Sequence, residues 1–320
     1  MALLYKKSAG LNNYIDPVRH VYDREEGVSE LTTAVNVDVD PSGMIKRSMG
    51  YTQLVAGDYH SMCPFDCGGY TLAMKGTTLY AVDVEGNETA VRTGMTAGAR
   101  VYYEQAWDGS RDLTYYVNGY ERGRVFSRTS YTWNKTEEVM VDELDSLEGP
   151  PDDGFLLALF NGRMYIAFDV SRVVASEPTD FHKFNYATSI MNFNGPVHAI
   201  FAVASGLYVS HGKQISFLAG EDILPGEGIN PLSFRRVFDS YIVPGMYTKT
   251  LHRNVGIDAP GEGYLCYTPK GIVFAGDNGN LTNLTYTRLS GRKGNSYLPD
   301  GTDGAAMVMD DERLILTISK

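Results

Sequence analysis

Three cysteines are the residues of this chain best suited to binding a metal ion. Cys63 and Cys67 lie four positions apart, His60 precedes them, and Cys266 comes much later in the sequence. Thiolates and imidazoles are zinc ligands, but this spacing matches no common zinc module, and an odd cysteine count does not suit a secreted disulfide framework. We therefore expect reduced, partly buried thiols and no metal site. A zinc site formed by Cys63, Cys67 and Cys266 is the open alternative.

A second candidate metal site is the run Asn36-Val-Asp38-Val-Asp40. Its alternate oxygen ligands resemble the start of a calcium loop, which needs a glycine directly after the third ligand and a closing glutamate. Both are missing here, and the intervening valines favour a strand whose polar side chains point outward in a row. We expect the solvent face of a strand and no calcium.

The sequence contains none of the familiar catalytic motifs: no nucleophile elbow, no phosphate-binding loop and no zinc-protease helix. His211 and His252 lie in predicted turns, where we expect solvated side chains. Adjacent carboxylates lie in turn-like or acidic stretches typical of solvated loops: Asp142–Glu143, Asp152–Asp153 and Asp310–Asp311. The aspartate box of sialidase-type blades is absent, and its nearest fragment is Ser130–Trp133. We predict that the chain is not an enzyme and has no catalytic, cofactor-binding or metal-binding residues.

Short strands dominate the elements that would position any site. The chain has 22 Tyr, 13 Phe and 34 Gly, which suits pleated surfaces punctuated by turns. Strict alternation over Val35–Val39, a turn at Pro41–Gly43 and a second run at Met44–Arg47 predict a hairpin. The one stretch with helical spacing is Glu137–Leu147, read as a short helix or an acidic excursion.

An internal repeat is the stronger signal. Four units share an apolar strand, a tight turn with a glycine, and an apolar–aromatic strand, and two poorer units resemble them. Their anchors are Tyr80, Tyr116, Tyr165, Tyr208, Phe274 and Ile315. The spacing averages about 47 residues, the length of a four-stranded propeller blade. The longest gap, between Tyr208 and Phe274, predicts an insertion around Glu221–Gly228. The sequence thus predicts an all-β fold, a β-propeller of about six blades.

The domain organisation follows from where the repeat begins. Residues 1–30 show no period that would build a blade, so we expect an amino-terminal arm that makes assembly contacts. Residues 31–320 form a single propeller. We expect its ring to be closed by the strand near 35–39 and the carboxy-terminal strand, because an open ring would expose strand edges.

Charge and hydropathy limit the partners. The formal net charge is −11, which excludes a basic nucleic-acid coat but allows DNA to slide past an acidic wall. No leader peptide and no apolar run of membrane-spanning length is visible, so we expect synthesis in a cytoplasm and no membrane insertion.

The amino-terminal segment carries a resemblance to a known family. It runs from Gly10-Leu-Asn through Pro17-Val-Arg19 and Glu30-Leu31 to Asn36-Val-Asp38 and Gly50-Tyr51. This order resembles virion proteins of tailed bacteriophages, in kind the β-propeller tail-nozzle or phage stabilisation proteins of short-tailed phages. The resemblance implies a structural subunit of the virion tail. It also implies a homo-oligomeric ring, six copies in number, below portal and adaptor proteins, whose lumen passes DNA during genome ejection without sequence-specific binding.

Two other functions fit the same propeller. A receptor- or glycan-binding protein at the tail tip would use exposed aromatic side chains as stacking platforms, with Trp107 and Trp133 as candidates. A propeller glycosidase would need paired carboxylates at a shared site, and no motif supports that.

Overall fold

The computed structural model describes residues 55–63, 69–135, 147–225, 229–252 and 261–284 in full, together with the backbone of seven further strands. These residues form strands and no α-helix, which confirms the all-β prediction. In this part of the chain, no helix is long and apolar enough to cross a membrane.

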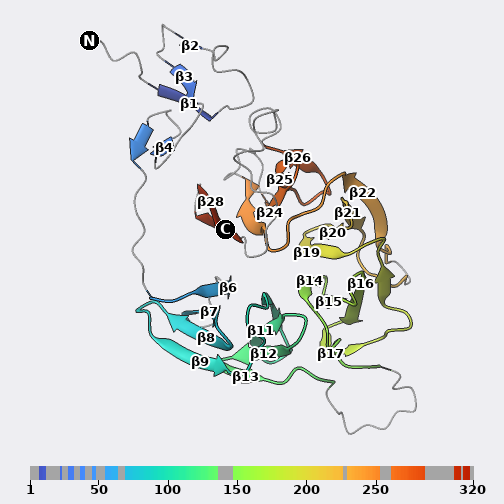
Figure 1. Cartoon of the computed structure of the whole chain (residues 1–320). Coiled ribbons are helices and arrows are strands. Elements are labelled where there is room, and N and C mark those ends of the chain that lie inside the picture. Colours follow the sequence, from blue (N-terminus) through green and yellow to red (C-terminus); the bar gives the residue numbers. More distant parts are fainter. Residues whose placement is uncertain are drawn as a thin grey trace.

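Five antiparallel sheets follow one another along the chain and are arranged as a ring of blades (Figure 1). Blade 1 contains β6 (Tyr59–Cys63), β7 (Tyr70–Lys75), β8 (Thr78–Asp83) and β9 (Glu88–Arg92). Blade 2 contains β10 (Tyr102–Trp107), β11 (Asp112–Val117), β12 (Arg122–Phe126) and β13 (Thr129–Tyr131). Blade 3 contains β14 (Leu156–Phe160), β15 (Arg163–Phe168), β16 (Arg172–Glu177), β17 (Asp180–Phe184) and β18 (Ile190–Asn192).

Blade 4 contains β19 (Val197–Val203), β20 (Gly206–His211), β21 (Gln214–Ala219) and β22 (Ser233–Phe238). Blade 5 contains β23 (Tyr247–Leu251), β24 (Glu262–Thr268), β25 (Gly271–Ala275) and β26 (Leu281–Asn283). The first strands of successive blades lie side by side: β6 with β10, β10 with β14, and β14 with β19. The fold is therefore a β-propeller, as the repeat predicts.

The described residues form five blades, one fewer than the six predicted. The first five anchors fall in separate blades, but the sixth, Ile315, lies in β28 (Arg313–Thr317). This strand pairs with β27 (Ala306–Asp310) in a sheet of two strands, and β27 lies beside β23. Repeat spacing located the hairpin but could not show how many strands its sheet contains.

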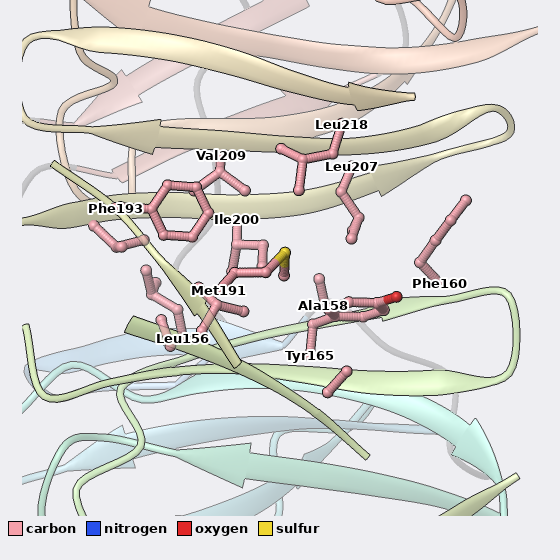
Figure 2. Close-up of a cluster of buried hydrophobic side chains, with 14 residues drawn as sticks. Leu156, Ala158, Phe160, Tyr165, Met191, Phe193, Ile200, Leu207, Val209 and Leu218 are labelled. Atoms are coloured by element: carbon pink, nitrogen blue, oxygen red, sulfur yellow. The ribbon is translucent and has the colours of Figure 1, made fainter. Parts of the chain in front are cut away.

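The core lies between the blades because both faces of each sheet are covered. All six residues of β15 and of β20 are buried. Figure 2 shows one such layer, where side chains of β14 such as Leu156 and Ala158 meet Ile200, Leu207 and Leu218 of blade 4. Strands buried on both faces read as continuous apolar runs, which is why the repeats stood out in the sequence.

The predicted insertion falls in the connection between β21 and β22, and part of it is fixed against blade 3. Arg163 in β15 is buried, and its Nε lies 2.8 Å from Oδ1 of Asp222. Asn161 Nδ2 donates to the backbone carbonyl of Glu221 over 2.7 Å. This connection therefore joins two blades as well as two strands.

The amino-terminal strands form two small sheets of their own. β1 (Lys7–Leu11), β3 (Val28–Leu31) and β2 (Tyr22–Asp23) make one sheet, in which β1 and β3 are parallel. The arm thus contains three short strands where we expected no period. β4 (Val37–Val39) pairs with β5 (Ile45–Arg47), and this confirms the hairpin. Pairing of β4 with β28 to close the ring stays a prediction, and the acidic stretch 136–146 lies outside the described residues.

Candidate functional site

One side chain connects two blades that are not neighbours in the sequence. Arg100, just before β10, donates from Nη1 to the carbonyl of Pro244, just before β23, over 2.9 Å. The Arg100 guanidinium also donates to the Tyr102 hydroxyl. The segments that precede β10 and β23 therefore contact each other, which joins blades 2 and 5 directly.

Glu104 is the one carboxylate in this arrangement. It belongs to the aromatic run Val101–Trp107, is half-buried, and accepts a hydrogen bond from the backbone N–H of Leu159 in β14. Burial raises the pKa of Glu104 to about 7, although that hydrogen bond and the Lys249 ammonium act in the opposite direction. A carboxyl that titrates near neutral pH at the centre of a fold is the kind of group that catalytic or binding sites use.

The surroundings of Glu104 are aromatic. Phe201 stacks on Tyr264 at a centroid separation of 4.3 Å and on Tyr247 at 5.4 Å. Burial raises the pKa of both tyrosines, and the Glu104 charge contributes to each shift. These rings pack on one another and on the hydrophobic cluster between blades 4 and 5, so the surroundings of Glu104 have the character of a core.

Other buried polar side chains tie one blade to the next. Arg124 in β12 contacts Nε2 of His182 in β17 at 3.1 Å, and His182 Nδ1 lies 2.9 Å from the carbonyl of Asn134. Since a guanidinium only donates, Nε2 must accept, and the Nδ1–H then donates to Asn134. His182 is therefore held neutral, and burial lowers its pKa.

The two tryptophans have different positions. Trp133 is 1% exposed, donates from Nε1 to the Phe181 carbonyl over 2.8 Å, and packs on Tyr115 with ring centroids 4.8 Å apart. The proposal of Trp133 as a stacking platform is therefore wrong, because its apolar rings and its donor are both used in the core. Trp107, at the end of β10, is 56% exposed.

The thiols do not come together. Cys63 and Cys266 are both buried but belong to separate core clusters, and burial raises the pKa of Cys266 well above its ordinary value. Over the described ranges, no three Cys, His, Asp or Glu side chains form a group that could hold a metal ion. Cys67 and the side chains of Asn36, Asp38 and Asp40 lie outside those ranges.

The paired carboxylates and the turn histidines are placed as follows. Asp152 pairs with Arg122, and Asp153 accepts from the backbone N–H of Asp169 over 2.9 Å, so both belong to loops. The side chains of Asp142–Glu143 and Asp310–Asp311 lie outside the described part of the chain. His211 and His252 are buried, so the expectation of solvated side chains is wrong.

Blade 4 also contains a Ser–His contact that the sequence did not predict. His211 Nε2 lies 2.9 Å from Oγ of Ser216, one hairpin later in blade 4. Such pairs can activate a serine, but both residues are 4% exposed, and substrate would have no access to Oγ. The spacing of five residues across a tight turn is a signal that could have predicted the contact between His211 and Ser216. For Glu104, the signal is a lone carboxylate within an aromatic run.

No family model and no curated protein matches the sequence. Among solved structures, the chain is similar to the gluconolactonase XC5397 from Xanthomonas campestris, with 11% identity, a TM-score of 0.46, and coverage of 82% of this chain and 84% of that chain. It is also similar to BBS1N in complex with ARL6DN (8% identity, TM-score 0.45, 77% and 74% covered). A third similarity is to Saccharomyces cerevisiae Sqt1 (11% identity, TM-score 0.39, 76% and 64% covered). At these identities and scores the neighbours carry no argument about function, and the propeller follows from this chain's own sheet order.

Proposed function

We propose that this protein is a structural subunit of a bacteriophage tail. It would belong to the nozzle or to a head–tail or tail-tip ring, and form part of the genome-delivery conduit. The observation that supports the proposal is the use of polar side chains as joints between blades. Arg163 is buried, Arg100 and His182 are partly buried, and each of the three contacts a residue of another blade or of a connection between blades. A scaffold needs such joints, whereas an enzyme would leave some of these groups available to substrate.

The packing of the blades bears on where DNA would pass. Rings of Phe201, Tyr247 and Tyr264 stack on one another at the core between blades 4 and 5, and Arg100 joins blades 2 and 5. We propose that the conduit lies between copies, in the lumen of a ring of this chain, proposed as six copies. The net charge of −11 suits a wall that repels the DNA backbone and binds no sequence.

The same proposal covers partners and location. Portal, adaptor or other tail proteins would stack on the ring. The chain would be made in the host cytoplasm and would end in the virion tail, with no membrane insertion.

Within each copy, β27 beside β23 would provide the start of a sixth blade, completed by β4 and β5. We propose this closure because it would cover the open edges of both hairpins.

Two deletions test the arm and the closure separately. Removing residues 1–25 is expected to leave the melting transition unchanged and to abolish incorporation into particles. Removing residues 1–48 also deletes β4 and β5 and is expected to lower the melting temperature. Mass photometry of the intact chain should show a ring. A monomer that also fails to enter particles would contradict the proposal.

A receptor- or glycan-binding role at the tail tip is the second candidate, and the exposure of Trp107 favours it. Binding of host polysaccharide that Trp107→Ala abolishes would support this role over a purely structural one. A glycosidase is the third candidate, and none of its familiar motifs is found in the sequence. We propose that the chain has no such activity, and turnover of chromogenic glycosides at an enzyme-like rate would contradict this.

A further inference from the structure

Val170 has a backbone conformation that its side chain disfavours. It follows Asp169 in the turn between β15 and β16, with φ of 43° at Asp169 and 63° at Val170. Left-handed φ is unusual for any residue with a Cβ and a true outlier for a β-branched one. The turn before it, between β14 and β15, reaches similar angles with Asn161 and Gly162, at 46° and 75°. That pair of residues adopts these angles easily, so the strain at Val170 comes from the choice of residue.

A comparable strained position in blade 2 has a visible use. Arg128 has a φ of 64°, its backbone N–H donates to the Tyr70 hydroxyl over 3.2 Å, and its guanidinium lies 5.5 Å from the centre of that ring. The strain there positions a contact with blade 1. At Val170 the backbone carbonyl accepts from Val197 N–H over 2.8 Å, but the side chain is 61% exposed. The backbone contact with blade 4 does not require an exposed, β-branched side chain at this position, and a strained residue of this kind is an indication of function.

A second exposed apolar residue lies on the same face of the propeller. Tyr120, 70% exposed, is in the turn between β11 and β12, which is the turn of blade 2 equivalent to that of Val170 in blade 3. The two turns are fixed to the same linker, since Gly119 N–H donates to the Gly154 carbonyl over 2.8 Å and Asp169 N–H donates to Asp153. We call Tyr120 and Val170 the apolar knob.

Three carboxylates belong to the turn of Val170 and to the linker that holds both turns. Asp152 is almost fully exposed although it pairs with Arg122, Asp169 pairs with Arg172 and is also exposed, and Asp153 lies between them. The knob thus offers apolar area within a rim of three carboxylates and two guanidinium groups. A matching partner would carry apolar side chains followed by positive charge.

We infer that the apolar knob binds the first residues of the amino-terminal arm of a neighbouring copy. That segment reads Leu3-Leu4-Tyr5-Lys6-Lys7. Its three apolar side chains would contact the apolar knob, and its two lysines would pair with the carboxylates beside the knob. A neighbouring copy is favoured because β1–β3 of the same copy lie outside the ring, across it from blades 2 and 3 (Figure 1). The inference rests on the proposed function, because it requires copies to associate.

The first test separates this contact from folding. Val170→Asn is expected to raise the melting temperature by a few degrees, because Asn tolerates left-handed φ, and to lower the assembled fraction in mass photometry at least tenfold. Tyr120→Ala is expected to lower assembly similarly, with little effect on melting. Val84→Asn is the matched control, since Val84 is 74% exposed in a turn between the third and fourth strands of blade 1. It should leave assembly unchanged.

The second test identifies the occupant. A benzophenone amino acid in place of Ala2, in full-length chain mixed with isotope-labelled chain, should cross-link between copies to peptides containing Tyr120 or Val170. Cross-links within one copy, or between copies to other blades, overturn the contact. Unchanged assembly of both Val170→Asn and Tyr120→Ala also overturns the contact. That result would leave the proposal of a ring of copies intact. An intact chain that stays monomeric at every concentration and does not enter particles overturns the proposed function as well.

Discussion

Arg163 of β15 and Asp222 of the β21–β22 connection form an ion pair between blades 3 and 4, with Nε and Oδ1 2.8 Å apart and the arginine side chain 5% exposed. Arg163 also donates from Nη1 to the Ser176 carbonyl over 2.6 Å. A charge buried this deeply is tolerated because its partners are in place. The connection that looked like an insertion in the sequence is therefore part of the joint between two blades.

Removing one partner of this pair should be costly. Asp222→Asn leaves the buried Arg163 guanidinium with only the more distant Glu177 carboxylate, 3.9 Å from its Nη1, and we expect the free energy of unfolding to fall by about 3 kcal/mol in urea titrations. The matched control is Asp169→Asn in the exposed pair with Arg172, which should cost under about 1 kcal/mol. Equal effects of the two variants would show that the joint does not depend on this pair.

Glu104 should make the protein less stable as pH rises to neutrality. Its pKa in the fold is about 7 against a usual 4.5, so between these values the folded state binds more protons than the unfolded state. Stability is then greatest below about pH 4.5 and is lost as pH rises through 7. Glu104→Gln should raise the free energy of unfolding at pH 8 by on the order of 1–3 kcal/mol and change little at pH 4.5. A variant less stable at pH 8 would show that the carboxylate is needed in its charged form.

Three histidines, of which His211 is buried and His182 and His198 are partly buried, should act in the opposite direction. Burial lowers the pKa of His182, His198 and His211 below 6.5, so the unfolded state takes up protons first as pH falls. Stability that is present above pH 6.5 is lost below it. In a Glu104→Gln background, the melting temperature should fall between pH 7.5 and 5. The fall should be smaller after His182→Gln, because a glutamine amide can replace the neutral imidazole without gaining a proton. Parallel pH curves for the two proteins would contradict this.

The propeller could be predicted from the sequence because its strands are covered on both faces. Buried strands such as β15 and β20 give apolar runs ending in Gly turns, and that pattern repeats at blade length. The blade count could not be predicted, since Ile315 marks a hairpin as clearly as it would mark a blade. Whether a hairpin pairs with further strands depends on contacts between residues that are distant in the sequence. Counting repeats does not detect such contacts.

The candidate site was harder to predict for a related reason. Glu104, Leu159 and Tyr264 belong to three blades, and no local pattern brings them together. The turn histidines were misjudged because a turn at the rim of a blade is covered by its neighbour. His211, for example, packs on Phe193, which precedes blade 4. The resemblance to phage proteins concerns residues 10–52, where the structure describes only short strands.

The last prediction distinguishes the two tryptophans and, with them, the glycan-binding alternative. Trp133→Phe should lower the free energy of unfolding by about 2–3 kcal/mol, because it leaves a cavity against Tyr115 and removes the donor to the buried Phe181 carbonyl. Trp107→Phe should change stability by less than about 0.5 kcal/mol, since its ring is exposed. Urea titrations of both variants, followed by polysaccharide binding, separate folding from recognition. If Trp107→Phe weakens binding while folding is intact, the tail-tip role gains support. If neither stability nor binding responds to Trp107, its exposure reflects only the end of a strand.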